Sequence, residues 1–119
     1  MPIAMHNERD NVYCVEIRGL LRKGDLEQCQ EQLAAEMGRV GPVRLLFLLT
    51  DFQGWEPSPD WNDLTFYVTH GGAIERIAIV GPDQWRSEML MFAGADLRSA
   101  PVEFFPPGTA AEAREWLSS

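Results

Sequence analysis

The sequence predicts an α/β protein built on a mostly parallel sheet of four or five strands with four helices. Two segments, residues 43–49 and 76–80, are apolar at almost every position. Strands of this kind lie in the middle of a parallel sheet and are covered on both faces. Segments with helical spacing alternate with these strands, and turns containing Gly and Pro separate them. This alternation implies right-handed crossovers, and the expected order is β-β-α-β-α-β-α-β-α.

The chain is expected to begin with a β-hairpin. Residues 2–7 and 12–19 flank a polar turn at residues 8–11. In the second arm, apolar residues alternate with Glu16 and Arg18, as in a strand that buries one face. Two antiparallel strands are therefore expected here.

The first helix is expected to start at Asp25, with Gln28 as its capping-box partner. Its buried face is expected to carry four apolar residues at helical spacing: Leu26, Cys29, Leu33 and Met37. Gly38 and the Gly41–Pro42 pair are expected to end it.

The central strand, residues 43–49, is expected to lead into a loop at residues 51–57 and then a second helix. Ser58 is the expected N-cap of that helix, and Pro59 suits its first helical position. One face of the helix carries four residues at helical spacing: Trp61, Leu64, Thr65 and Val68. The Gly71–Gly72 pair is expected to end it.

The remaining elements follow the same alternation. Ile74 and residues 76–80 form the next buried strand, and Asp83 is expected to cap a third helix with one apolar stripe: Trp85, Met89 and Phe92. Residues 102–105 form a short strand. Thr109 and Glu112 predict a capping box for the last helix, whose inward residues are Ala113, Trp116 and Leu117.

Composition favours a single domain over residues 1–119. The chain is 45% hydrophobic and 24% charged, and its net charge is −8. That charge disfavours nucleic acid and anionic lipid headgroups as partners. The longest apolar run, residues 45–49, is far shorter than the ~20 residues of a membrane-spanning helix. Residues 1–10 hold no apolar signal core, so a cytoplasmic location is expected.

The cysteines predict buried thiols and no metal site. Cys14 and Cys29 form no C-x-x-C pair, and neither has a histidine at metal-ligand spacing. A disulfide is not expected in a reducing compartment, and no cofactor is indicated.

Several segments, taken together in order and spacing, resemble the SpoIIAA-like family of small bacterial proteins with a STAS-type fold. The matching positions are VRLL (43–46), DFQGW (51–55), His70, ERIAIVG (75–81), Trp85, Phe104, Phe105, Ala113, Trp116 and Leu117. The resemblance covers residues 11–117 and implies a non-catalytic role. It also implies binding of an apolar ligand and association with membranes.

The resemblance further bears on regulation. STAS-type anti-anti-sigma factors are switched by phosphorylation of a Ser or Thr at the start of the second helix. Residues 51–55 contain no hydroxyl, and Ser58 lies later as a helix cap. The sporulation-type switch is therefore not expected.

Three residues are candidate ligand contacts. Asp51 lies at the carboxyl end of the central strand, where open α/β sheets bind ligands. Asp51 is interpreted as an acid, a base or a polar anchor, or as a cap for loop amides. His70 lies near the end of the second helix, where it either caps the helix or takes part in catalysis. Trp55 stands in the predicted loop, where it either binds ligand or packs.

An apolar pocket is expected between the second and third helices and the sheet. Its predicted lining is Trp55, Trp61, Phe66, Met89 and Phe92. Leu90 and Met91 add apolar side chains on other sides of the third helix, so they predict a second patch for a membrane or a partner. Given the negative charge, membrane contact would rely on apolar insertion.

Two other functions remain open in the sequence. The same patch suits a protein-interaction module, including a homodimer. An enzyme using Asp51 and His70 would need both side chains to reach a common cavity. The chain lacks the G-x-G-x-x-G, phosphate-loop, G-x-S-x-G and H-E-x-x-H motifs, so a non-enzymatic role is expected.

Overall fold

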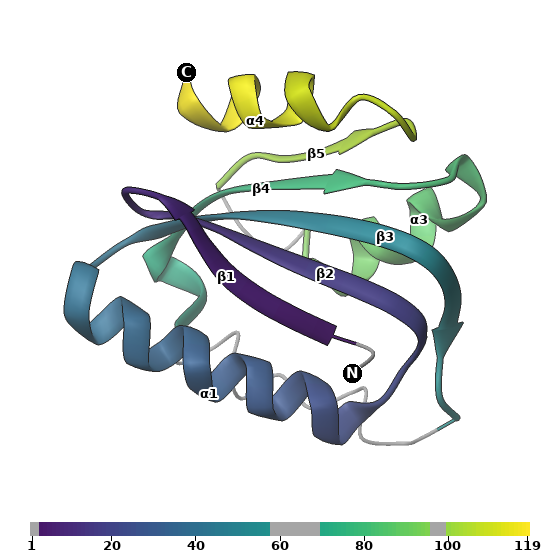
Figure 1. Cartoon of the computed structure of the whole chain (residues 1–119), viewed down its shortest axis with the longest axis horizontal. Coiled ribbons are helices and arrows are strands. Elements are labelled where there is room, and N and C mark those ends of the chain that lie inside the picture. The colour runs from purple at the N-terminus through teal and green to yellow at the C-terminus, as the bar shows by residue number, and fades with distance from the viewer. Residues whose placement is uncertain (1–2, 58–69, 96–99) are drawn as a thin grey trace.

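The computed structural model describes residues 3–57, 70–95 and 100–119, and five strands form one sheet in the order β1-β2-β3-β4-β5 (Figure 1). The strands are β1 (Ile3–Arg9), β2 (Val12–Leu21), β3 (Val43–Trp55), β4 (Ile74–Val80) and β5 (Val102–Phe105). β1 and β2 are antiparallel, and the other neighbouring pairs are parallel. The predicted α/β class, the mostly parallel sheet and the N-terminal hairpin are confirmed.

Helices cover the two faces of the sheet unequally. α1 (Lys23–Val40) and α3 (Arg86–Phe92) contribute to one core, and α4 (Ala110–Ser118) covers the other face (Figure 1). Two short 3-10 helices, η2 (Gly71–Ala73) and η3 (Asp83–Trp85), precede β4 and α3. The sheet therefore lies between two layers of helix, as α/β proteins require.

Strand alternation divides the core between these faces. In β2, Tyr13 and Ile17 belong to the core under α1 and α3, while Cys14 belongs to the core under α4. In β3, Leu45 and Leu46 divide in the same way. β3 is thus buried on both sides, as its apolar sequence predicts.

α1 differs from its prediction at its start, and at its end one of the two predicted stops, Gly41, is confirmed. It begins at Lys23, not at Asp25, and the backbone N–H of Lys23 donates to Glu56 Oε1 at 2.8 Å. The side chain of Glu56, which directly follows β3, thus accepts from a backbone N–H in the first turn of α1. In many helices the side chain of a local N-cap residue plays this role. Gly38 does not end the helix. Gly41, at φ 84°, ends it and donates its N–H to Met37 O at 2.8 Å.

The loop predicted at residues 51–57 is wrong, because β3 continues to Trp55. Pairing with β4 stops at Leu48, but pairing with β2 runs on, as far as Leu21 with Trp55. The register shifts on either side of Gly19, and Asp51 adopts φ 49°. These irregularities bend the strand along β2 beyond the point where β4 ends.

The predicted side-chain caps of the last two helices are also wrong. The third helical segment starts as a 3-10 turn after Pro82, without a side-chain cap from Asp83. Thr109 precedes α4, but its Oγ1 donates to Pro106 O at 2.7 Å, and it makes no capping box with Glu112. In each case the turn before the helix provides the local hydrogen bonding.

Of the inward residues predicted for α4, Ala113 and Leu117 are fully buried, and Trp116 is half-buried against Phe105. The second helix predicted from Ser58 falls mainly on residues 58–69, outside the described residues. No helix in the described part of the chain is long and apolar enough to cross a membrane.

Candidate functional site

Four aromatic rings gather where β3 extends beyond β4. Phe52 and Trp55 come from β3, Trp85 from η3 and Phe92 from α3. The ring centroids are 5.1 Å apart for Phe52 and Trp55, and 4.9 Å apart for Phe52 and Trp85. Trp55 lies 6.0 Å from Trp85 and 5.6 Å from Phe92. We call these four residues the aromatic cluster, and their edge-to-face and tilted geometry is typical of stabilising aromatic pairs.

A glycine brings Trp85 close to the strand. Gly54 adopts φ 97°, and a Cβ atom at this position would lie 3.2 Å from Trp85 Cη2. A side chain here would strain the backbone and press on the indole ring. Gly54 therefore lets the edge of the indole ring of Trp85 approach the backbone of β3.

The indole of Trp85 carries the one buried side-chain polar atom that lacks a hydrogen-bond partner among the described residues. Its Nε1–H is shielded from solvent. Buried polar groups are nearly always paired, so an orphaned indole N–H marks a place where an acceptor is missing. The aromatic cluster thus combines apolar rings with one unused donor.

The structure brings several predicted ligand contacts together. Trp55 and Phe92 are in ring contact, and Met89, fully buried, belongs to the same core. Leu90 is half-buried against that core, whereas Met91 is 78% exposed. The predicted apolar patch thus reaches solvent through Met91.

Other predicted site residues stand apart or cannot be placed. Asp51 is exposed on β3, four residues before the strand ends, and is not at its carboxyl end. His70 is half-buried and directly precedes η2. Trp61 and Phe66 lie outside the described residues. Phe52 and Trp85 are the cluster members that the ligand prediction did not include, and Trp85 was expected only in a helix stripe.

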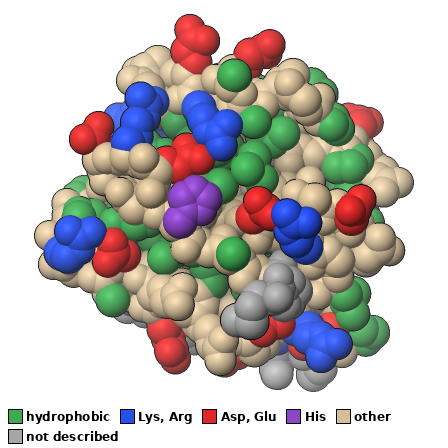
Figure 2. Space-filling view, viewed as in Figure 1, with side chains coloured by type: hydrophobic (Ala, Val, Ile, Leu, Met, Phe, Trp, Pro, Cys, Tyr) green, Lys and Arg blue, Asp and Glu red, His purple; other side chains and the backbone are tan. Residues whose placement is uncertain are grey.

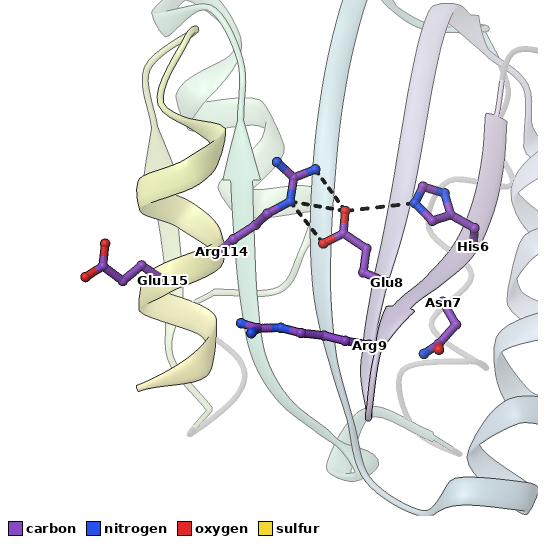
Figure 3. A pocket seen from close by; sticks show the side chains of 6 residues that line it. All are labelled: His6, Asn7, Glu8, Arg9, Arg114 and Glu115. Carbon is purple, nitrogen blue, oxygen red and sulfur yellow. Dashed lines mark hydrogen bonds and ion pairs between the residues drawn. The ribbon is translucent and has the colours of Figure 1, made fainter.

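A second group of polar residues surrounds the N-terminal hairpin and α4. It lines an open pocket of about 610 Å³ (Figure 3) formed by His6, Asn7, Glu8, Arg9, Arg114 and Glu115. Arg114 Nη2 donates to Glu8 Oε1 at 2.8 Å, and Arg114 Nε donates to Glu8 Oε2 at 3.0 Å. The Arg114 guanidinium therefore lowers the pKa of the Glu8 carboxyl, against the opposing effect of burial.

Cys14 on β2 lies close to two of the residues that line this pocket, His6 and Glu8. It pairs with His6 across the hairpin, and one ligand atom from each of His6, Glu8 and Cys14 lies within 4.8 Å of the others. Burial, assisted by the charge of Glu8, raises the pKa of the Cys14 thiol to about 11. Sequence spacing missed this group because the hairpin register, not a short ligand motif, brings His6 and Cys14 together.

Comparisons with known proteins agree with this architecture. A model of the SpoIIAA-like family matches residues 12–118. No match to this chain was found among the curated proteins. An uncharacterized protein of the DUF3478 family from Shewanella loihica PV-4, with a SpoIIAA-like fold, is 23% identical at a TM-score of 0.69. The alignment covers 97% of this chain and 91% of that chain.

Two structures of SpoIIAA share the fold at lower identity. The unphosphorylated anti-sigma factor antagonist SpoIIAA matches at 10% identity and a TM-score of 0.64, over 96% of this chain and 97% of that chain. The phosphorylated Bacillus cell fate determinant SpoIIAA matches at 10% identity and a TM-score of 0.59, over 95% and 98%. Identities this low show the fold alone. The family match over nearly the whole length shows that this chain belongs to the SpoIIAA-like family, which is not a known family of enzymes.

Proposed function

We propose that this chain is a non-catalytic binding module that takes up an amphipathic molecule at the aromatic cluster and contacts membranes reversibly. The observation that carries the proposal is the cluster itself, together with the orphaned Nε1–H of Trp85. The rings would contact an apolar chain, and the indole N–H would donate to a carboxylate or carbonyl oxygen at its head.

Entry of such a molecule requires movement of α3, because Met89 and the indole nitrogen of Trp85 are fully shielded. α3 has only seven residues and follows a 3-10 turn, so few hydrogen bonds hold it. Its displacement would expose apolar area at a cost of about 25 cal/mol per Å², which a bound apolar chain would recover.

A fluorescent fatty acid, cis-parinaric acid, tests this proposal. Wild-type protein is expected to bind the probe saturably, and Trp55→Ala is expected to weaken binding about tenfold or more, since it removes the ring that contacts three others. Trp116→Ala is the matched control, because Trp116 packs against Phe105 on the face covered by α4. Equal effects of the two variants, or no binding by the wild type, would overturn the proposal.

Membrane contact has a separate test at Met91. Flotation with phosphatidylcholine vesicles is expected to carry the wild-type chain upward, and Met91→Asp to stay in the dense fraction. Gln32→Glu, at an exposed position on α1, is the control for the negative charge that Met91→Asp adds. With a net charge of −8, adding phosphatidylglycerol should not increase recovery. A chain that never floats, or that floats only with anionic vesicles, would contradict membrane contact by apolar insertion.

A second candidate function is docking of a protein or of a second copy of this chain through the same patch. The exposure of Met91, at 78% beside half-buried Leu90, favours such docking. The anti-sigma factor antagonist SpoIIAA also shares the fold. Sedimentation velocity separates self-association from lipid binding. A dimer that persists on dilution and is lost in Met91→Asp would support the homodimer, and a strictly monomeric chain would exclude it.

A further inference from the structure

Three different metal-ligand side chains converge on one face of the N-terminal hairpin. His6 lies opposite Cys14 in the antiparallel pairing of β1 with β2. Glu8 follows His6 by two residues on β1, so alternation keeps it on the same face. The register between the strands shifts between Asn7 and Arg9, so Glu8 stands at the irregularity. Such irregularities re-aim a side chain, and here the carboxylate comes within 3.9 Å of His6 Nε2.

The spacing of the three ligand atoms is close to that of a metal centre. All three lie within 4.8 Å of one another. Tetrahedral zinc with bonds of 2.0–2.3 Å separates its ligand atoms by about 3.3–3.8 Å. Small side-chain rotations would close the remaining gap. The imidazole of His6 is exposed and free to turn, since its side chain is 61% accessible.

We propose that His6 Nε2, a Glu8 carboxylate oxygen and Cys14 Sγ form a three-ligand site for a divalent transition metal of the zinc class. Imidazole, thiolate and carboxylate together suit borderline-soft ions such as Zn²⁺ and Co²⁺ better than Mg²⁺ or Ca²⁺. On binding, the metal replaces the proton of the Cys14 thiol, and that proton leaves to solvent.

The surroundings leave room for a fourth ligand. The pocket beside His6 and Glu8 is open and measures about 610 Å³, so a water molecule or a small anion can complete the coordination. Cys14 is buried, with 1% exposure, whereas the His6 side chain is 61% accessible and lines the pocket (Figure 3).

Arg114 is compatible with this site although it carries a positive charge. It holds both oxygens of Glu8: Oε1 accepts two of its hydrogen bonds and Oε2 accepts one, so Oε2 keeps a second lone pair for a metal. Carboxylates that bind metals are commonly oriented by a hydrogen bond from a second residue. Arg114 would act as that positioning residue for Glu8, and its charge would moderate the affinity for the cation.

A cobalt titration of the tag-free, full-length chain tests the proposal. The wild type is expected to bind one Co²⁺ per chain with a thiolate-to-cobalt charge-transfer band in the near ultraviolet, and Zn²⁺ is expected to displace it. Cys14→Ser should abolish the band. Cys29→Ser is the matched control, because Cys29 is also a buried free thiol, on α1 in the core on the other face.

His6→Gln keeps the test decisive if Cys14→Ser fails to fold, because His6 is exposed and its replacement leaves the core intact. The expected result is an affinity for Co²⁺ lowered about tenfold or more. The proposal is overturned by the absence of cobalt binding, by binding without the charge-transfer band, by an unchanged His6→Gln titration, or by equal loss in Cys29→Ser.

Discussion

Glu8 shows how a single residue links distant parts of the chain. It lies on the first strand and is held by Arg114 of the last helix through three hydrogen bonds of 2.8–3.2 Å. The Glu8 side chain is 15% exposed and that of Arg114 is 42% exposed, so solvent screens the pair only in part. The pair joins the β1 edge to α4.

This pairing predicts a pH-dependent contribution to stability. The pKa of Glu8 is lowered below its ordinary value of 4.5 by its hydrogen bonds from Arg114. A lowered folded-state pKa stabilises the protein above the ordinary pKa, and the gain is lost as the pH falls through the lowered pKa. Arg114→Gln should therefore reduce the free energy of unfolding at pH 7 by about 0.5–1 kcal/mol. Urea unfolding should show that difference shrinking towards zero in acid. A difference that does not change with pH would contradict this origin.

Gly81 and Gly38 predict opposite effects of the same substitution. A Cβ atom at Gly81 would lie 2.6 Å from Leu49 Cδ1 and 3.0 Å from Leu49 Cβ, and the latter cannot rotate away. Gly81→Ala should therefore destabilise the protein by about 1–3 kcal/mol. Gly38 lies inside α1 with open space around it, so Gly38→Ala should stabilise by about 0.5–1 kcal/mol. Thermal unfolding of both variants checks these two predictions. Melting temperatures that shift in the same direction for Gly81→Ala and Gly38→Ala would contradict them.

Residue-level prediction from the sequence failed where partners are distant in the chain. Asp25 and Thr109 satisfy the local pattern of a cap, but the start of α1 uses Glu56, which is 33 residues away. The proximity of His6 and Cys14 escapes sequence spacing for the same reason, because the register of β1 on β2 brings the two residues together. Local spacing carries no information about such contacts.

At the scale of elements, two arginines from neighbouring strands hold the C-terminus of α4. Arg44 donates to the carbonyl of Leu117, and Arg76 Nη1 donates to Trp116 O at 2.7 Å. The Arg76 guanidinium also lies 5.2 Å from the centroid of the Trp116 ring. These donors reach carbonyls of the last turn, of which that of Trp116 also accepts from the Ser119 N–H, and they complement the helix dipole.

Replacing Arg76 by methionine tests this attachment. Arg76→Met keeps the apolar stem but loses the hydrogen bond and the cation–π contact, so the free energy of unfolding should fall by about 1–2 kcal/mol. Arg18→Met is the control, because Arg18 is exposed and, among the described residues, forms its ion pair with Glu16 two positions away on the same strand. The measurement is chemical unfolding. If both variants lost the same free energy of unfolding, the contacts of Arg76 with α4 would contribute no more to stability than an exposed ion pair.

The order of the strands and of the helices that the structure describes was predictable because hydrophobic period and turn residues are local signals. The almost uninterrupted apolar run of residues 43–49 indicated a strand in the middle of the sheet. Residues 76–80 and 102–105, also predicted as strands, lie in β4 and β5. The extension of β3 was not predictable, since residues 51–55 contain the polar Asp51 and Gln53 and a glycine at position 54. Pairing with β2 imposes the extended conformation there.

At the scale of the whole molecule, the two sheet faces carry different chemistry. The face under α1 and α3 holds the larger core and the aromatic cluster, and the face under α4 holds the smaller core, with the hairpin pocket beside it. Acidic and basic side chains lie interspersed on the surface shown in Figure 2. Two proposed binding sites on separate faces can thus be tested independently.

The part of the candidate site that the sequence predicted is the apolar part. Met89 and Phe92 share one core because helix periodicity directs them inward, and Trp55, predicted as a loop aromatic, packs against the same core from the end of β3. The close approach of Trp85 depends on the positive φ of Gly54 and on the short 3-10 turn. Neither feature has a distinct sequence pattern.

Native mass spectrometry of the chain purified without added ligand tests the central claim of apolar ligand binding most directly. The account predicts that wild type and Trp116→Ala carry an additional mass, extractable into organic solvent, that Trp55→Ala lacks. Spectra showing only the bare chain for all three proteins, or the same adduct on all three, would contradict the assignment of the aromatic cluster as the binding site.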